Sequence, residues 1–128
     1  MNSKSKMTLA VLAGAALGAA AIQGLHAQAK PPAYAVVDIS EITDQKIFDQ
    51  IGPKAGPSSA AFGGKFIIRT NNITGVVGGT PPKRLVVIAF DSVEKANAWA
   101  SSPAQKEVMD LNSKSTKSRT FIAEGMPN

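Results

Sequence analysis

The sequence predicts an α+β fold in which four strands alternate with two helical regions. The clearest strand is residues 85–90, where six apolar residues follow one another and must be covered on both faces. Ser102-Pro103 is a specific helix start, since serine caps a helix and proline fits its first position. Segments rich in β-forming residues, 34–40 and 119–124, lie near the two ends of the domain.

The first strand and the first helix follow from local patterns. Residues 34–40 are extended in character and largely apolar on both faces. Asp44 fits the N-cap position of a helix, because its side chain can accept a hydrogen bond from the first turn. Ile47, Phe48 and Ile51 then share one helical face. A strand followed by an amphipathic helix is therefore expected.

Glycines and prolines divide the middle of the domain. Gly52-Pro53 interrupts the first helix, which we expect to resume over residues 57–62. Gly63-Gly64 ends it, because glycine tolerates the left-handed conformation of a helix C-terminus. Residues 65–69 are predicted as the next strand.

The second strand is expected to continue past a bend and to form a hairpin with the third. Asn71-Asn72 indicates a bend or bulge, after which residues 73–77 resume an extended pattern. Residues 78–82 contain two glycines and two prolines, which are poorly suited to a strand ladder. These residues are therefore predicted as the loop that leads to the strand at residues 85–90.

The second half of the domain repeats helix and strand. Ser92 fits the N-cap of a helix over residues 93–100, and Ser102-Pro103 starts another helix. Residues 112–118 are polar and basic and are predicted as a loop. Residues 119–124 form the last predicted strand.

This order of elements is the ferredoxin-like βαββαβ arrangement, a four-stranded antiparallel sheet with helices on one face. The helices leave the other face uncovered, although residues 34–39 and 85–90 are apolar on both sides. A second copy packed sheet against sheet would cover that face, so we predict a homodimer in the form of a dimeric α+β barrel. The alternative is a monomer with an exposed apolar sheet.

The N-terminal residues 1–29 have the layout of a secretory signal peptide. Lys4 and Lys6 precede an uncharged apolar run over residues 7–22. The run is shorter than the about 20 residues of a spanning helix, so cleavage is favoured over an uncleaved anchor. Cleavage after Ala27 or Ala29 would export the domain to the periplasm or the medium. No membrane association is expected after cleavage.

Composition excludes several kinds of chemistry from the exported domain. The chain has no cysteine and one histidine, His26, which lies in the predicted leader. Thiolate or imidazole metal sites and Ser-His-Asp triads are therefore excluded within one processed chain, and we expect no metal and no bound cofactor. A Pro-rich spacer at residues 30–33 precedes a single domain over residues 34–126.

Three segments carry a resemblance to a known family: Phe62-Gly63-Gly64-Lys65, Pro81-Pro82-Lys83-Arg84 before a strand that ends Phe90-Asp91-Ser92, and Ala98-Trp99 followed by Ser102-Pro103. In their order and spacing they resemble the family catalogued as domain of unknown function 1330, over residues 34–126. The resemblance implies a dimeric ferredoxin-like barrel, similar to small monooxygenases and decarboxylases that need no metal or bound cofactor. The sequence departs from the family pattern at Gly52-Pro53, where related chains look more continuously helical.

Six side chains are candidates for a ligand pocket between the sheet and the helices: Tyr34, Phe62, Arg69, Arg84, Phe90 and Trp99. Either arginine could hold a carboxylate through two hydrogen bonds, although surface or interface salt bridging would also explain them. Tyr34 and Trp99 combine an aromatic surface with a polar group, and core packing is the alternative for Trp99. Asp38 could act as a base if buried, or it marks the solvated end of an edge strand.

Two functional hypotheses remain open. The first is binding of a small molecule, including an anionic one, in the pocket, with or without catalysis that needs no cofactor. The second is a non-catalytic periplasmic module for protein association. The formal net charge of +5 includes the leader, and the basic residues lack interspersed stacking aromatics, so nucleic-acid binding is not expected.

Overall fold

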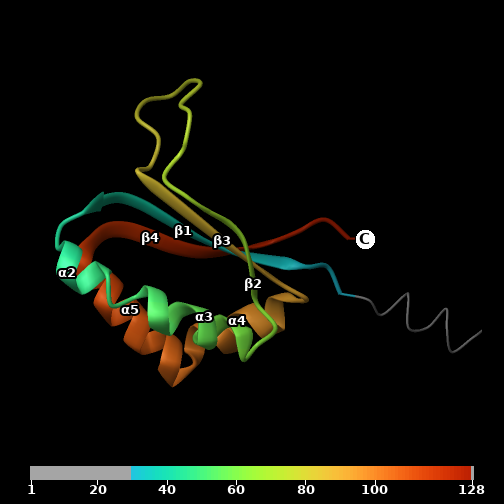
Figure 1. The fold of residues 1–128 in the computed structure, drawn as a ribbon. Helices are drawn as coiled ribbons and strands as arrows, with labels where there is room; N and C mark the ends of the chain where they lie inside the picture. Colours follow the sequence, from blue (N-terminus) through green and yellow to red (C-terminus); the bar gives the residue numbers. More distant parts are fainter. Residues whose placement is uncertain (1–29, 128) are drawn as a thin grey trace, which may run out of the picture. The chain divides into compact units, whose positions relative to one another are not determined.

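Four antiparallel strands form one sheet, and four helical segments cover one of its faces (Figure 1). The structure is a computed structural model that describes residues 30–127. Along the chain the elements are β1 (Ala33–Ile42), α2 (Gln45–Phe48), α3 (Gly52–Ala60), β2 (Lys65–Thr70), β3 (Arg84–Phe90), α4 (Val93–Ser101), α5 (Pro103–Ser115) and β4 (Thr116–Glu124).

The strand order is β2-β3-β1-β4, and each neighbouring pair is antiparallel. β3 separates β1 from β2, and β1 separates β3 from β4, so each helical connection crosses over one strand. The predicted ferredoxin-like βαββαβ fold, with its helices on one sheet face, is confirmed. The sheet is open, with β2 and β4 as its two edges.

The core lies between the sheet and α4, where small residues on β1 make room for a large aromatic pair. Ala33, Ala35 and Ala96 are fully buried against Phe90 and Trp99. The Phe90 and Trp99 rings pack at a tilt of 40°, with centroids 5.2 Å apart. Aromatic pairs in such tilted arrangements contribute more than their buried area alone.

The first helical region is divided, and its second part begins earlier than predicted. Asp44 caps α2 as expected, because its Oδ1 accepts a hydrogen bond from the Ile47 N–H over 3.1 Å. α2 ends at Phe48, and α3 begins at Gly52 rather than at residue 57. Pro53 lies in the first turn of α3, where the missing N–H costs nothing, so Gly52-Pro53 starts a helix as well as ending one.

The predicted glycine stop after α3 is confirmed in detail. Gly63 has φ +75, the left-handed conformation that glycine adopts without penalty. Its N–H donates to the Ala60 carbonyl over 3.0 Å, and the Gly64 N–H donates to the Ser59 carbonyl over 2.9 Å. This pair of bonds is a Schellman motif, which satisfies carbonyl groups at the end of the helix. The chain can then enter β2 at once.

The predicted extension of the second strand over residues 73–77 is wrong. β2 ends at Thr70, whose Oγ1 accepts a hydrogen bond from the Asn72 N–H over 2.9 Å. The next strand, β3, begins at Arg84, so residues 71–83 lie outside the sheet ladder. They form a loop that projects from the sheet (Figure 1), and Val76 and Val77 at 92% exposure are solvated.

The predicted loop over residues 112–118 is also wrong. α5 continues to Ser115, and β4 begins at Thr116 with no intervening loop. The Ser115 hydroxyl donates to the Leu111 carbonyl over 2.7 Å, and the Thr116 hydroxyl donates to the Asn112 carbonyl over 2.8 Å. These bonds satisfy the final helical carbonyls from within the chain, which removes the need for a loop.

The predicted leader at residues 1–29 lies outside the described residues. Within residues 30–127, no helix combines the length and the apolar character needed to cross a membrane.

Candidate functional site

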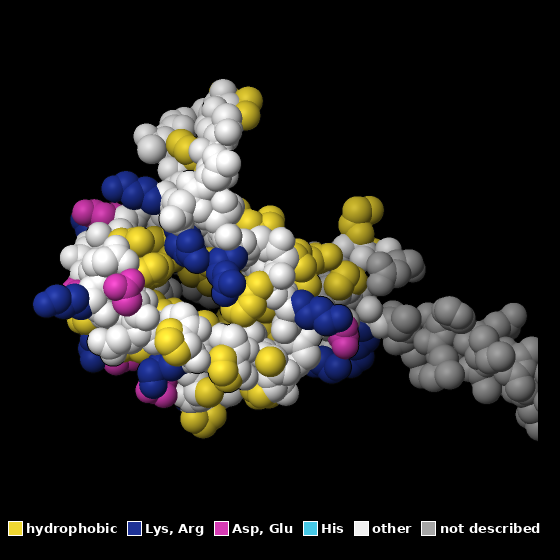
Figure 2. Space-filling view, viewed as in Figure 1, with side chains coloured by type: hydrophobic (Ala, Val, Ile, Leu, Met, Phe, Trp, Pro, Cys, Tyr) yellow, Lys and Arg dark blue, Asp and Glu magenta, His cyan; other side chains and the backbone are white. Residues whose placement is uncertain are grey.

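A cavity of about 160 Å³ lies between the sheet and the helices. Figure 2 shows the corresponding hollow, with basic side chains at its rim. The strands contribute Val37, Ile39, Phe66, Arg69, Arg84, Val86, Ile88 and Thr120, and the helices and the turn between α2 and α3 contribute Phe48, Ile51, Gly52, Ala55, Trp99, Gln105, Val108, Met109 and Asn112.

The lining is mainly apolar and carries positive charge without negative charge. Its two ionisable residues are Arg69 and Arg84, and no aspartate or glutamate lines the cavity. Gln105, Asn112 and Thr120 add polar groups that can donate hydrogen bonds. A cavity of this composition favours an apolar body that carries an anionic group.

Arg84 reaches the cavity from the first residue of β3, on the same strand face as Val86 and Ile88. Its Nη1 donates to Asn71 Oδ1 over 2.8 Å, and its guanidinium carbon lies 6.0 Å from the centre of the Phe48 ring. These contacts hold the half-buried guanidinium in place. The bond to Asn71 uses one of its five N–H donors, so donors remain for a ligand.

Arg69 reaches the same cavity because β2 contains a bulge. Phe66 pairs with Ile88, Ile68 with Val87, and Arg69 with Val86, which leaves Ile67 as an extra residue. In a strand without a bulge, residues 66 and 69 are three positions apart and would lie on opposite sheet faces. The bulge instead places both on the helix side, where the Arg69 guanidinium carbon lies 5.0 Å from the centre of the Phe66 ring.

Neither cavity arginine forms an ion pair with a carboxylate within residues 30–127, whereas the third arginine of this part does. Arg119 Nε lies 3.1 Å from Asp38 Oδ2, on the opposite face of the sheet. Surface salt bridging, one part of the alternative explanation for Arg69 and Arg84, is therefore not seen for either residue within this part of the chain. Their guanidinium groups remain available to an external anion.

Trp99 and Gln105 form part of the helical wall. Trp99 is 2% exposed, and its Nε1 is the buried side-chain polar atom without a hydrogen-bond partner in the described part of the chain. Its ring is therefore held by packing against Phe90. Gln105 is 5% exposed, and its Oε1 accepts a hydrogen bond from the Ser58 hydroxyl over 3.0 Å.

Of the six predicted pocket residues, Arg69, Arg84 and Trp99 line the cavity, and three others do not. Phe62 and Phe90 belong to the hydrophobic core, Phe90 as a member of the buried cluster and Phe62 packed against it. Tyr34 lies between the buried Ala33 and Ala35 on β1, so strand alternation turns it to the opposite sheet face. There it packs closely against Gly125.

Asp38 does not reach the cavity either. It alternates with the cavity residues Val37 and Ile39, so it faces away from the helices. There it pairs with Arg119. Asp38 is therefore not a base of this cavity, and it does not mark the end of an edge strand either, because β1 is an inner strand of the sheet.

The helical wall could have been found from sequence periodicity. Gln105, Val108, Met109 and Asn112 are spaced as i, i+3, i+4 and i+7, which places them on one face of α5. A search restricted to apolar residues misses this face because two of the four residues are amides. Phe66 was missed because its position relative to Arg69 depends on the bulge.

The described residues contain no evident metal-binding site. Between residues 30 and 127, no group of three or more histidine, cysteine, aspartate or glutamate side chains is placed to hold a metal ion. The groups that line the cavity are suited to binding anions and hydrogen-bond acceptors.

The fold and the cavity define a ferredoxin-like protein with an arginine-lined pocket between its sheet and its helices. The chain belongs to the family described as domain of unknown function 1330, whose model matches residues 32–126. The resemblance identified from the sequence motifs is thereby confirmed. No curated protein shows significant similarity to the chain.

Solved structures share the fold at low sequence identity. A protein of unknown function from Rhodopseudomonas palustris is 13% identical with a TM-score of 0.62, over 76% of this chain and 84% of that chain. SnoaB, a cofactor-independent oxygenase from Streptomyces nogalater, is 8% identical with a TM-score of 0.55, over 77% and 96%. A dimeric ferredoxin-like protein of unknown function from Thermobifida fusca is 12% identical with a TM-score of 0.52, over 74% and 92%. These similarities concern the fold.

Proposed function

We propose that the protein binds a small organic anion, with the apolar body of the molecule in the cavity and its anionic group on Arg69 and Arg84. The observation that carries the proposal is that both arginines line an apolar cavity and neither is paired with a carboxylate of the described chain. Guanidinium groups bind carboxylates through paired hydrogen bonds, and a partly desolvated site strengthens them.

The size of the cavity limits the apolar body to about one six-membered ring. A cavity of about 150 Å³ in another protein holds benzene, and this one measures about 160 Å³. The apolar walls from Val86, Ile88 and Val108 favour a hydrocarbon body over a sugar or a nucleotide. A small cyclic or branched carboxylic acid fits this description.

Binding is better supported than acid–base catalysis. The lining contains no carboxylate or imidazole that could abstract a proton near neutral pH. Asp38, the sequence candidate for a base, lies on the other sheet face. We therefore assign the cavity side chains to binding and orienting the ligand.

We also propose that the protein acts as a homodimer through the uncovered sheet face. Val36, Leu85 and Val87 lie on the face opposite the cavity, and Ile68 and Phe121 extend it at 40% and 44% exposure. Asp38 and Arg119 neutralise each other on the same face. A second copy would remove this apolar surface from water. The dimeric Thermobifida fusca protein of the same fold supports the proposal.

Export is proposed from the leader. The charged start, the apolar run and the Ala27-Gln28-Ala29 segment favour cleavage and release of the domain. If so, the protein recovered outside the cytoplasm begins at Gln28 or Lys30 when its N-terminus is sequenced. An intact Met1 on the exported fraction would instead show an uncleaved anchor.

Ligand binding can be tested with the fluorescence of Trp99, the single tryptophan of the chain and a cavity residue. The probe is cyclohexanecarboxylate, and cyclohexylmethanol is its neutral counterpart. Both are transparent at the excitation wavelength, so a change in emission reports the pocket. We expect the acid to bind at least tenfold more tightly than the alcohol, because charge-assisted hydrogen bonds are stronger than neutral ones.

Matched variants separate the cavity charges from overall charge. Arg69→Gln and Arg84→Gln should each weaken binding of the acid by about tenfold and leave binding of the alcohol unchanged. Lys83→Gln removes the same charge from an exposed neighbour outside the cavity and should have less than a twofold effect. Binding of neither probe, or equal binding of both, would overturn the proposal.

A further inference from the structure

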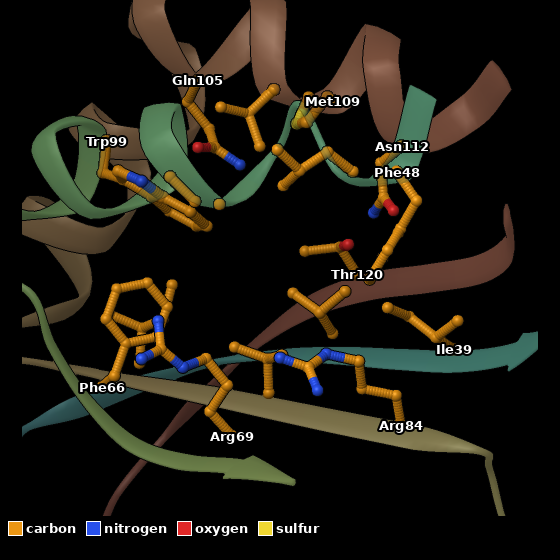
Figure 3. A pocket seen from close by; sticks show the side chains of 17 residues that line it. Ile39, Phe48, Phe66, Arg69, Arg84, Trp99, Gln105, Met109, Asn112 and Thr120 are labelled. Carbon is orange, nitrogen blue, oxygen red and sulfur yellow. The ribbon is translucent and has the colours of Figure 1, made fainter. Parts of the chain in front are cut away.

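The cavity wall opposite the arginines carries a second polar group, the side-chain amide of Gln105. Gln105 lies in the first turns of α5 and is 5% exposed, an unusual position for an amide. In Figure 3 it extends from the helices toward the cavity, while Arg69 and Arg84 rise from the strands on the other side. The two kinds of polar group therefore face the same space from opposite walls.

The orientation of the amide is set by Ser58 of α3. The Ser58 hydroxyl donates to Gln105 Oε1 over 3.0 Å, and Ser58 is itself 3% exposed. With its oxygen held in this direction, the amide turns its Nε2 toward the cavity (Figure 3). Nε2 forms no hydrogen bond with any residue between 30 and 127. Two N–H donors are thus presented to the cavity by a fixed and buried side chain.

Among residues 30–127, Trp99 Nε1 is the buried side-chain polar atom without a partner, so Gln105 Nε2 is accessible from the cavity. A ligand that fills the cavity would remove this access, and buried polar groups in proteins are paired as a rule. The lining residues Asn112 and Thr120 carry acceptor oxygens, but neither forms a hydrogen bond with Gln105 Nε2. An acceptor supplied by a ligand would satisfy this donor. The same group would then discriminate against ligands that lack the acceptor, because binding them would leave the amide buried and unpaired.

We propose that the ligand is an oxygenated carboxylic acid, with its carboxylate on the arginines and a carbonyl or hydroxyl oxygen at its opposite end accepting from Gln105 Nε2. This inference rests on the proposed function and adds the chemical class of the ligand. A ring of the size that the cavity accepts carries such a pair of groups at its 1 and 4 positions. Gln105 is assigned as a specificity-determining residue, and Ser58 as the residue that positions it.

The test compares 4-oxocyclohexanecarboxylate with cyclohexanecarboxylate, which differ only in the ketone oxygen. Their dissociation constants are measured by Trp99 fluorescence and checked by calorimetry, with the purified full chain. We expect the keto acid to bind about fivefold more tightly, the effect of one net hydrogen bond. Gln105→Met keeps a long unbranched side chain but removes the donor, so it should abolish this preference and bring the dissociation constants of the two acids together.

Ser58→Ala provides a second variant that does not touch the cavity lining. It releases the amide oxygen, so we expect the preference for the keto acid to fall without a loss of affinity for cyclohexanecarboxylate. Equal binding of the two acids by the wild type, or a preference that survives in Gln105→Met, would overturn this inference and leave the proposed function standing. Failure of both acids to bind would overturn the proposed function itself.

Discussion

The hydroxyl of Ser102 donates a hydrogen bond to the carbonyl oxygen of Trp99 over 2.7 Å. The same hydroxyl oxygen accepts a hydrogen bond from the Gln105 N–H over 3.2 Å. One side chain therefore fixes the junction between α4 and α5 and, with it, the spacing of two residues in the cavity wall. The helix start that the sequence signals at Ser102-Pro103 is thus also a structural element of the site.

Ser102→Ala should therefore affect both stability and ligand binding. We expect the free energy of unfolding to fall by about 1–2 kcal/mol, since an N-cap and a buried hydrogen bond are lost together. Denaturant unfolding measures the change, and the emission of folded Trp99 should shift as its surroundings relax. Ser92→Ala removes the N-cap of α4, whose oxygen accepts from the Lys95 N–H over 3.2 Å, outside the cavity lining. It should reduce stability by about 1 kcal/mol without altering affinity for cyclohexanecarboxylate.

Gly64→Ala should destabilise the domain because β2 approaches the core closely at this point. A Cβ atom there would lie 2.8 Å from Phe90 Cε1 and 3.0 Å from Ile88 Cγ2, and both neighbours are buried. We expect a loss of about 1–3 kcal/mol in denaturant unfolding. Gly56→Ala is the matched control. Nothing lies within 4 Å of its Cβ position in α3, so it should instead stabilise by about 0.5–1 kcal/mol.

Deletion of Ile67 tests the role of the bulge. With Ile67 removed, Phe66 can still pair with Ile88 and Arg69 with Val86, and strict alternation then keeps the side chains of Phe66 and Arg69 on the helix side of the sheet. We therefore expect a deletion variant that folds to keep the tenfold preference for cyclohexanecarboxylate over cyclohexylmethanol, in contrast to Arg69→Gln. Ile67→Ala keeps the residue count and should retain the preference, since Ile67 is 55% exposed and does not line the cavity. A folded deletion variant that loses the preference, while Ile67→Ala keeps it, would show that pairing of Arg69 with Val86 is not what places the guanidinium in the cavity.

The parts of the fold that the sequence predicts correctly have strong local causes. Asp44, Ser92 and Ser102 each form the N-cap bond that their position indicates, and Gly63 takes the left-handed conformation expected of it. The errors arise where partners decide the structure. Residues 73–77 have a strand-like composition but no neighbouring strand, and residues 112–118 are polar but are held by hydrogen bonds to the preceding helical turn.

The site was harder to predict because it depends on register and on contacts distant in sequence. Arg84 could be assigned from strand alternation alone. Arg69 reaches the cavity only through a bulge at Ile67, and Gln105 is oriented by Ser58, 47 positions away in the sequence. Aromatic character was a poor guide, since Tyr34 faces the other side of the sheet. Contacts between residues that are distant in the sequence leave no pattern in the neighbouring residues from which they could be predicted.

The uncovered sheet face leads to the last prediction, which concerns Phe121→Glu. Phe121 pairs with Val36 in the ladder between β4 and β1 and is 44% exposed, so a charge there should cost the single chain little. Arg119, whose guanidinium carbon lies 5.7 Å from the centre of the Phe121 ring, is already paired with Asp38. A sheet-to-sheet dimer would therefore bury two carboxylates against one guanidinium on each subunit, at a cost of several kcal/mol. Sedimentation should show a dimer for the wild type and a monomer for Phe121→Glu. Val76→Glu places the same charge on the projecting loop, where Val76 is 92% exposed, and should remain dimeric. A wild-type protein that sediments as a monomer at micromolar concentration would overturn the dimer, and the apolar face would then need another occupant.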